Sequence, residues 1–425
     1  MSELRSRSNR PPRVAGVARH GRLKKSAAWK TVLGLIGGTL AVALVAGGAV
    51  AGIAAWQLQS NIKTATIQAD TQGPPPNIAS FAGGFNILLV GSDTRVGQDG
   101  IGKGPDDGGE LNDVTMLMHV AQDQKSATVV SIPRDMVVPI PRCSKGGGAS
   151  GLPINTSLSY GGLACTVLVV QNLTGLKIQF AGLITFTGVA AMSNAVGGVD
   201  VCVGKAISDP YTGTFLSAGT HTLQGLAALE FLRSRHGVGD GSDLGRIGSQ
   251  QVFLSALVRK IKSSDTLTNF GKLYAIAQAA TQHITLSQNF THLDTLVSVA
   301  LVLKNIPLQN IVFVQYPGRT GGTGIYAGKV QPVASIANQL MAAIKADKPI
   351  GLDSQALTGA HGGSTLDTHA PTATPTPTPT GKKGSTSSPT ATPTDDLDTA
   401  PPATVIPGLK GQSAATYTCT EGRKG

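Results

Sequence analysis

The chain has 425 residues, a formal net charge of +11 and an aromatic content of only 4%. Residues 1–30 hold nine Lys and Arg residues against Glu3 alone, so this segment carries +8 of that charge. The remaining +3 is too small for the basic surface that a polyanion requires, and the charge therefore excludes a nucleic-acid partner.

An uncharged apolar stretch follows the basic segment, over residues 31–55, with Trp29 and Trp56 at its two edges. A helix of about 20 apolar residues crosses a hydrocarbon core of about 30 Å. Trp gathers at both membrane interfaces, and basic flanks stay on the cytoplasmic side. We predict a basic cytoplasmic tail at 1–30, a single-pass anchor in the cell membrane at 31–56, and an extracellular remainder. A cleaved signal peptide is the alternative, but its apolar run usually spans about 7–15 residues.

Four cysteines follow the apolar stretch: Cys143, Cys165, Cys202 and Cys419. An even number of cysteines outside the cell favours disulfides. We predict that Cys143 pairs with Cys165 and closes a Gly-rich loop, while the pairing of Cys202 with Cys419 stays open. The chain has no CxxC motif or His-rich cluster, so we expect no zinc site.

Short apolar runs alternate with longer helical patterns after a polar extracellular spacer at residues 57–80. The strands are expected at 85–90, 113–120, 127–132, 199–203 and 310–316. The helices are expected at 163–173, 186–195, 222–230, 247–262, 266–280, 293–303 and 333–345. This alternation predicts an α/β fold at 81–351, with a sheet covered by helices on both faces. The Pro- and Thr-rich composition of residues 352–425 predicts an extended, disordered tail.

Charged residues gather in the stretch FLRSRHGVGDGSDLGRIGSQQ, residues 231–251. If its beginning is extended, Arg233 and Arg235 share one face with Cα atoms about 7 Å apart, a spacing that suits two adjacent phosphates. Asp243 suits a helix N-cap, whereas a cation at Arg246 opposes the helix dipole. A bound anion would resolve that conflict, and an internal Asp–Arg pair closing a surface loop is the equal alternative.

Further charged residues stand at the ends of the expected strands: Asp93 and Arg95, then Asp113, then Arg134 and Asp135. Ligands gather outside strand ends in α/β sheets, and carboxylates there can hold Mg²⁺ together with phosphate. The set predicts a phosphate–metal site. The P-loop-like segment at 97–104 has Gly104 where Ser or Thr should hold Mg²⁺, so we set it aside.

Seven ordered motifs between residues 85 and 263 resemble the LytR–CpsA–Psr family of membrane-anchored cell-wall glycopolymer ligases: NILLVGSDTR, NDVTMLMHV, SIPRD, INTSLSYGG, AVGGVDVCV, AGTHTLQGLAALEFLRSRH and DLGRIGSQQ. The resemblance implies a mixed central sheet between helices and an apolar tunnel for a polyprenyl chain. It also implies a phosphotransferase that moves a glycan from polyprenyl pyrophosphate to a peptidoglycan hydroxyl. That reaction makes a phosphodiester and releases polyprenyl monophosphate.

The resemblance also implies roles for individual residues. Mg²⁺ would be held by Asp113 with help from Asp93. The catalytic residues would be Arg134, Arg233, Arg235, Asp243 and Arg246, and the substrate-binding residues Arg95, Asp135, Asn155 and Gln250. Asp93 and Asp135 stay equal candidates for the general base.

Two positions depart from the family's pattern, because Pro153 and Ser249 stand where a basic residue is common. Both departures remove positive charge near the expected site. They leave a second hypothesis open, a non-catalytic polyprenyl-phosphate-binding or sensory envelope protein. A DNA-binding regulator is excluded, because the sequence has no basic recognition helix.

Overall fold

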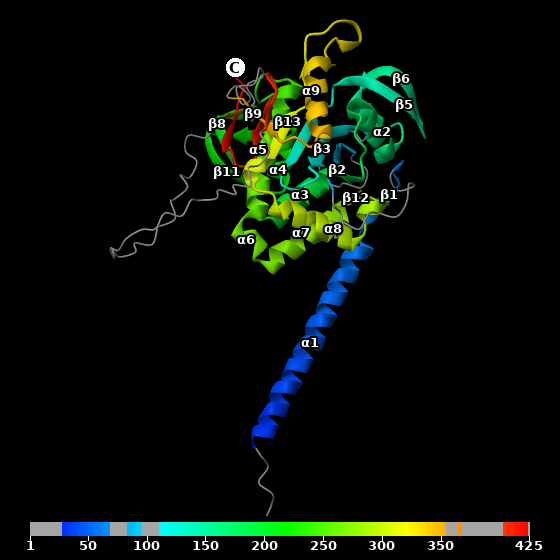
Figure 1. The fold of residues 1–425 in the computed structure, drawn as a ribbon. Helices are drawn as coiled ribbons and strands as arrows, with labels where there is room; N and C mark the ends of the chain where they lie inside the picture. The colour runs from blue at the N-terminus through cyan, green and yellow to red at the C-terminus, as the bar shows by residue number, and fades with distance from the viewer. Residues whose placement is uncertain (1–27, 69–82, 95–109, 354–363, 367–402, 424–425) are drawn as a thin grey trace, which may run out of the picture. The chain divides into compact units, whose positions relative to one another are not determined.

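The computed structural model describes residues 28–68, 83–94, 110–353, 364–366 and 403–423 (Figure 1). The chain divides into two compact units, Met1–Trp56 and Gln57–Gly425. Helix α1 (Ala28–Ser60) covers the predicted anchor. Its segment Leu35–Ser60 has a mean hydropathy of 2.0 and is the only helical segment among the described residues long and apolar enough to cross a membrane.

An eight-stranded sheet forms the centre of the second unit, in the order β1-β12-β7-β2-β3-β4-β13-β19. Three neighbouring pairs are parallel (β1 with β12, β2 with β7, β4 with β13) and the other four are antiparallel. The prediction of a mixed central sheet is therefore confirmed. The strands are β1 (Lys63–Ala65), β2 (Phe85–Ser92), β3 (Asn112–Val120), β4 (Ala127–Ile132), β7 (Phe180–Ile184), β12 (Ile284–Ser287), β13 (Ile311–Gln315) and β19 (Gly411–Ser413).

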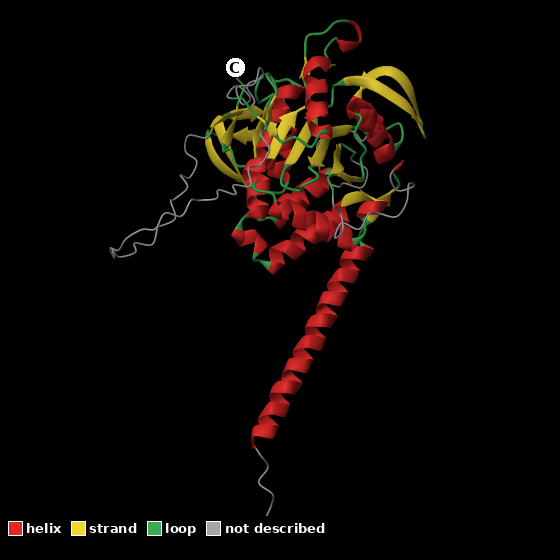
Figure 2. Cartoon of the chain, in the orientation of Figure 1, coloured by secondary structure: helices red, strands yellow, loops and turns green. Residues whose placement is uncertain are grey.

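Helices cover both faces of this sheet (Figure 2). The alternation of side chains along β2 divides the core, since Leu88 and Val90 join one apolar cluster and Phe85 and Ile87 join the other. The first cluster includes residues of α2 (Gly162–Thr174) and α9 (Ala334–Lys345). The second includes a residue of α8 (Leu293–Asn305), and partly buried side chains of α5 (Asp243–Lys262) pack against it.

The remaining elements surround this core. A four-stranded sheet has the order β11-β8-β20-β17, with β8 (Val199–Lys205), β11 (Gly219–Leu223), β17 (Ser364–Leu366) and β20 (Thr418–Glu421). Two hairpins are β5 (Val137–Cys143) with β6 (Gly146–Pro153), and β9 (Ile207–Asp209) with β10 (Thr214–Leu216). The further helices are η3 (Ile154–Ser157), α3 (Phe186–Ala195), α4 (Leu226–Arg233), α6 (Ser264–Leu267), α7 (Phe270–His283), η4 (Gln288–Phe290), η5 (Leu308–Asn310) and η6 (Gly324–Tyr326). The short strands are β14 (Gly318–Arg319), β15 (Gln331–Pro332), β16 (Ile350–Gly351) and β18 (Thr404–Val405).

The predicted disordered tail at 352–425 is wrong for residues 403–423, which join both sheets. β19 pairs with β13 at the edge of the central sheet, and β20 pairs with β8. Apolar side chains such as Ile406 and Leu409 are buried in the core. Disulfides join Cys143 to Cys165, as predicted, and Cys202 to Cys419. The domain therefore does not end at 351.

The spacer prediction is also wrong for part of 57–80, because Lys63–Ala65 forms β1. Two helix predictions need correction as well. The expected helix at 222–230 begins only at Leu226, because the β-branched Thr222 belongs to β11 and Gly225, at φ 59°, separates strand from helix. The expected helix at 266–280 is divided in two at Asn269, whose side chain caps α7.

Candidate functional site

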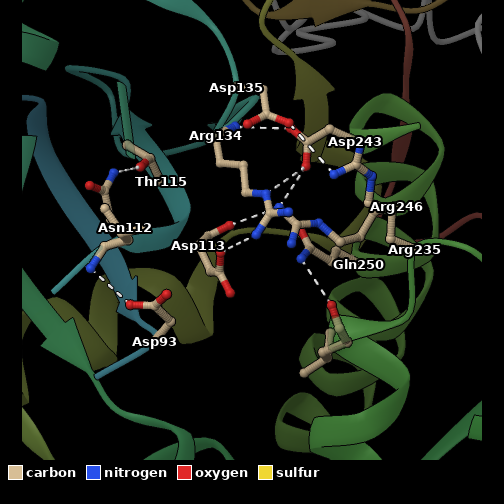
Figure 3. Close-up of polar contacts among 12 residues, drawn as sticks. Asp93, Asn112, Asp113, Thr115, Arg134, Asp135, Arg235, Asp243, Arg246 and Gln250 are labelled. Carbon is tan, nitrogen blue, oxygen red and sulfur yellow. Dashed lines mark hydrogen bonds and ion pairs between the residues drawn. The ribbon is translucent and has the colours of Figure 1, made fainter. Parts of the chain in front are cut away.

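A buried network of arginines and carboxylates joins β3, the turn after β4 and the start of α5 (Figure 3). Arg134 Nη1 donates to Asp113 Oδ1 at 2.5 Å, and the Arg134 backbone N–H donates to Asp243 Oδ2 at 3.0 Å. Arg246 Nη2 donates to the Asp113 carbonyl at 3.0 Å and lies 2.6 Å from Asp243 Oδ1. Two arginines thus meet two carboxylates from elements far apart in the sequence.

The first turn of α5 shows why the positive charge of Arg246 is stable near a helix N-terminus. Ser242 is the N-cap, since its Oγ accepts from the Gly245 N–H, so the prediction of Asp243 as the cap is wrong. Asp243 is the first helical residue and pairs with Arg246, three positions later. The internal pair is therefore the alternative that the structure supports. Both side chains are almost fully buried, at 2% and 3% exposed, so they do not close a surface loop.

Two aspartates in this region have opposite electrostatic surroundings. Burial raises the pKa of Asp113, but the charges of Arg246, Arg134 and Arg233 outweigh burial and hold that pKa below the ordinary value. Burial and the nearby Asp113 charge raise the pKa of Asp93, against the hydrogen bond from the Leu111 N–H. Groups with perturbed pKa values cluster at functional sites, so both aspartates are candidates for a functional role.

Arg233 and Arg235 do not lie on one extended strand, so that prediction is wrong. Arg233 is the last residue of α4, and its guanidinium lies 4.5 Å from the centroid of the Phe186 ring. Arg235 follows the helix, donates from Nε to the Gly241 carbonyl, and lies 3.7 Å from an Asp135 oxygen. Because α4 ends between these two residues, their side chains contact different neighbours.

The structure brings the other predicted residues to the margin of the network. Gln250 Nε2 donates to the Leu232 carbonyl at 3.1 Å and so joins α5 to α4. The Asn155 backbone N–H donates to the Arg134 carbonyl at 3.1 Å. Asp135 lies 3.7 Å from Lys329 Nζ as well as from Arg235. Arg95 lies outside the described residues.

A cavity of about 280 Å³ begins at this network and extends between the central sheet and the helices. Asp113, Arg233, Arg246 and Gln250 contribute to its polar end. Leu89, in the middle of central strand β2, is 39% exposed because its side chain lines the cavity. Gly182 lies on the neighbouring strand β7 and has no side chain that could fill the cavity. A Cβ at this position would lie only 3.2 Å from the Ile284 side chain. The remaining wall is apolar and includes Val189, Met192, Leu229, Leu254 and Leu257.

The metal prediction depends on Asp93 and Asp113. The described residues include no group of three or more His, Cys, Asp or Glu side chains that could hold a metal ion. Two carboxylates suffice for Mg²⁺ when phosphate oxygens and water complete its coordination. Asp93 and Asp113 are close enough that the charge of one raises the pKa of the other. This donor pair fits a Mg²⁺ ion that arrives with a phosphate.

One residue of the site region, Asp209, was missed by sequence reasoning. Its carboxylate is fully buried and accepts hydrogen bonds from Ser234 Oγ and from the backbone N–H groups of Arg235 and Gly237. It therefore fixes the turn that carries Arg235. The available signal was an acidic residue directly before Pro210, a combination typical of a turn whose side chain binds backbone N–H groups.

Comparison with known proteins gives bacterial relatives named for cell wall biosynthesis and teichoic acid transfer. The chain is 31% identical over 278 residues to the cell wall biosynthesis protein LcpA of Corynebacterium glutamicum, covering 58% of this chain and 53% of that protein. It is 32% identical over 301 residues to the probable cell wall biosynthesis protein LcpB of the same organism (69% and 67%). A Bacillus subtilis protein named polyisoprenyl-teichoic acid–peptidoglycan teichoic acid transferase TagT is 30% identical over 259 residues (59% and 76%). The chain thus spans about half the length of LcpA.

Solved structures support the fold. The crystal structure of B. subtilis TagV aligns with a TM-score of 0.51 at 22% identity, covering 63% of this chain and 97% of that one. A LytR-Csp2A-Psr enzyme from Actinomyces oris aligns with a TM-score of 0.51 at 22% identity (67% and 96%). The family described as LytR_cpsA_psr matches residues 54–342, more than half of the chain, and the chain therefore belongs to that family.

Proposed function

We propose that this protein is a phosphotransferase that moves a glycopolymer from a polyprenyl-pyrophosphate carrier to a peptidoglycan hydroxyl. The product is a phosphodiester, and polyprenyl monophosphate is released. The observation that supports this most strongly is the cavity, which joins an arginine-rich end to a long apolar wall. A ligand that satisfies both ends has an anionic head and a hydrocarbon tail.

The charged end suits the head group of such a donor. Arg233 and Arg246 line the cavity together with Gln250, so a pyrophosphate there meets cations and an amide. Arg246 and Arg134 are already fixed by Asp113 and Asp243. Their guanidinium groups therefore need little reorganisation when charge develops on the phosphate, which is the main requirement of phosphoryl transfer.

The reaction itself is a substitution at the phosphorus atom that carries the glycan. The oxygen of the peptidoglycan hydroxyl forms a bond to that phosphorus, and the bond to the bridging oxygen breaks. The leaving polyprenyl monophosphate keeps the bridging oxygen, while the hydroxyl proton passes to a base. Asp93 and Asp135 are the candidate bases.

Asp93 and Asp113 would hold Mg²⁺, which when bound supplies positive charge next to the pyrophosphate. Arg134 already occupies Oδ1 of Asp113, so this carboxylate orients an arginine whether or not a cation is present.

The apolar helix would anchor the protein in the cell membrane that contains the donor lipid. The basic residues 1–30 would remain in the cytoplasm, and the domain from Gln57 onward would lie outside. This orientation places the charged site on the same side as peptidoglycan.

The test is the release of polyprenyl monophosphate. The full chain in detergent would be incubated with glycan-loaded polyprenyl pyrophosphate, peptidoglycan fragments and Mg²⁺, in parallel with Arg233→Ala. Release that requires the acceptor, the metal and Arg233 supports the transferase. Tight donor binding without release, across several donors, would instead support a carrier or sensor, the role that the charge lost at Pro153 and Ser249 would favour.

A further inference from the structure

The carboxylate of Asp209 holds two surface segments together beside the site. Its Oδ2 accepts from Ser234, Arg235 and Gly237, and its Oδ1 accepts from the Tyr211 N–H at 3.2 Å. One buried group therefore sets the position of the turn that carries Arg235 and of the β9–β10 turn that carries Tyr211. Neither segment can shift without breaking hydrogen bonds to a buried charge, which is costly.

The consequence is an aromatic pair on the surface next to Arg235. Tyr211 is 82% exposed, and its ring centroid lies 4.7 Å from that of His236, with 45° between the ring planes. His236 directly follows Arg235, so their Cα atoms are about 3.8 Å apart. Arg235 in turn reaches Asp135, in the turn between β4 and β5 that also carries Arg134. The pair thus lies beside the turn that carries Arg235, while its rings remain largely in water.

An exposed aromatic pair held by a buried carboxylate suits a sugar. One face of a pyranose ring presents C–H groups that pack on an aromatic ring, while its hydroxyls hydrogen-bond to a phenol or an imidazole. We propose that Tyr211 and His236 form a sugar-binding subsite beside Arg235. This inference rests on the proposed function, in which a sugar ring flanks the reacting phosphate on both the donor and the acceptor.

The same hairpin provides a matched control. Asp209 and Thr214 form one cross-strand pair and are buried, whereas Ser208 and Phe215 form the next pair and face away from Asp209. Phe215 is 63% exposed. Phe215→Ala removes an exposed aromatic ring from the same hairpin, at a position that faces away from Asp209.

The experiment compares Tyr211→Ala, Tyr211→Phe and Phe215→Ala in the full chain. Dissociation constants are measured for glycan-loaded polyprenyl pyrophosphate, for the same lipid without the glycan, and for a soluble peptidoglycan tetrasaccharide. Loss of stacking on one ring should weaken a sugar ligand about three- to tenfold in Tyr211→Ala. Tyr211→Phe keeps the ring and should restore most of the affinity, and Phe215→Ala should behave like the wild type.

The ligand whose affinity falls identifies the source of the sugar. Weaker binding of the loaded but not the bare lipid assigns the subsite to the donor, and weaker binding of the tetrasaccharide assigns it to the acceptor. Unchanged affinity for all three ligands, or an equal loss in Phe215→Ala, would overturn the subsite. These experiments measure binding, so they do not depend on catalysis. Absence of turnover in the wild type would count against the proposed transferase activity but would leave the test of the sugar-binding subsite valid.

Discussion

The two ends of the cavity differ in how strongly each side chain depends on its neighbours. At the charged end, Asp113 meets Arg134 and Arg246, and each of those arginines also meets Asp243. Along the apolar wall, side chains such as Leu89 and Leu254 contribute area and shape without directed bonds. Single changes at the charged end should therefore have larger effects than single changes along the wall.

The largest effect is expected for Asp113→Asn. The change keeps the shape of the side chain but removes the negative charge that offsets Arg134 and Arg246. Transfer should fall roughly 10²–10³-fold, because Arg134 loses the carboxylate that fixes its orientation. The free energy of unfolding should also fall by about 3–5 kcal/mol, since breaking a buried pair leaves a charge uncompensated. Rate assays and denaturant unfolding measure the two losses.

Asp200→Asn, at an exposed position of β8, is the matched control for that change. Wild-type rates in Asp113→Asn would show that the network is structural and has no part in transfer.

A smaller loss is expected for Arg233→Ala, about ten- to a hundredfold in rate, the equivalent of one charge-assisted hydrogen bond. Arg233→Lys should recover only part of it, because an ammonium group keeps the charge but not the planar stacking on Phe186. Arg142→Ala removes an exposed arginine of β5 and should leave the rate unchanged. Full recovery by lysine would reduce the role of Arg233 to a point charge.

Along the wall, Leu89→Asp should weaken donor binding by roughly tenfold, because a carboxylate would face the hydrocarbon tail. Leu89→Met keeps an apolar side chain of similar volume and should have almost no effect. Leu226→Asp introduces the same charge at an exposed position of α4 and serves as control. Titration of a fluorescent polyprenyl phosphate measures each affinity, and equal binding by Leu89→Asp would place the tail elsewhere.

The smallest effect on transfer is expected for Asp209→Asn, which supports the charged end from outside the cavity. Burial raises the pKa of Asp209, but its hydrogen bonds from Ser234, Gly237, Arg235 and Tyr211 outweigh burial and lower the pKa below 3.8. The ionised form therefore stabilises the fold above about pH 4, and this stabilisation is lost as the pH falls through the lowered pKa.

Asp209→Asn should accordingly lower the free energy of unfolding by about 1–3 kcal/mol at pH 7. The difference from wild type should shrink as the pH falls below about 4. Transfer should decline only severalfold, since the Asn oxygen can still accept from the turn that carries Arg235. Thermal unfolding across pH 3–7 measures the effect, and a difference that persists unchanged at pH 3 would contradict the assigned charge.

The sequence allowed the central strands to be predicted because their apolar runs are short and bounded by polar ends, as in β2 and β4. The family resemblance also assigned Asp113, Arg134, Asp243 and Arg246 to one site before the structure was known. The sequence could not show whether Arg246 pairs with a bound anion or with Asp243. That choice depends on the ion pair between Asp243 and Arg246, three residues apart on the first turn of α5.

Other features depended on contacts that no local pattern reports. The geometry of Arg233 and Arg235 was predicted wrongly because the end of α4 could not be placed to within two residues. Asp209 contacts a turn 25 residues away. The strands within residues 403–423 follow a long Pro- and Thr-rich segment, and their composition alone gave no reason to place them in a sheet.

Strand β19 has a consequence for how the protein avoids self-association. It pairs with β13, whose five residues are all buried, and β19 itself is only three residues long. A short edge strand offers few unpaired backbone groups to a second chain, whereas an uncovered β13 would offer a flat apolar edge. A protein cut after the family match at residue 342 would expose that edge. If such a fragment aggregated, the cause would be the uncovered β13 edge and not damage to the active site.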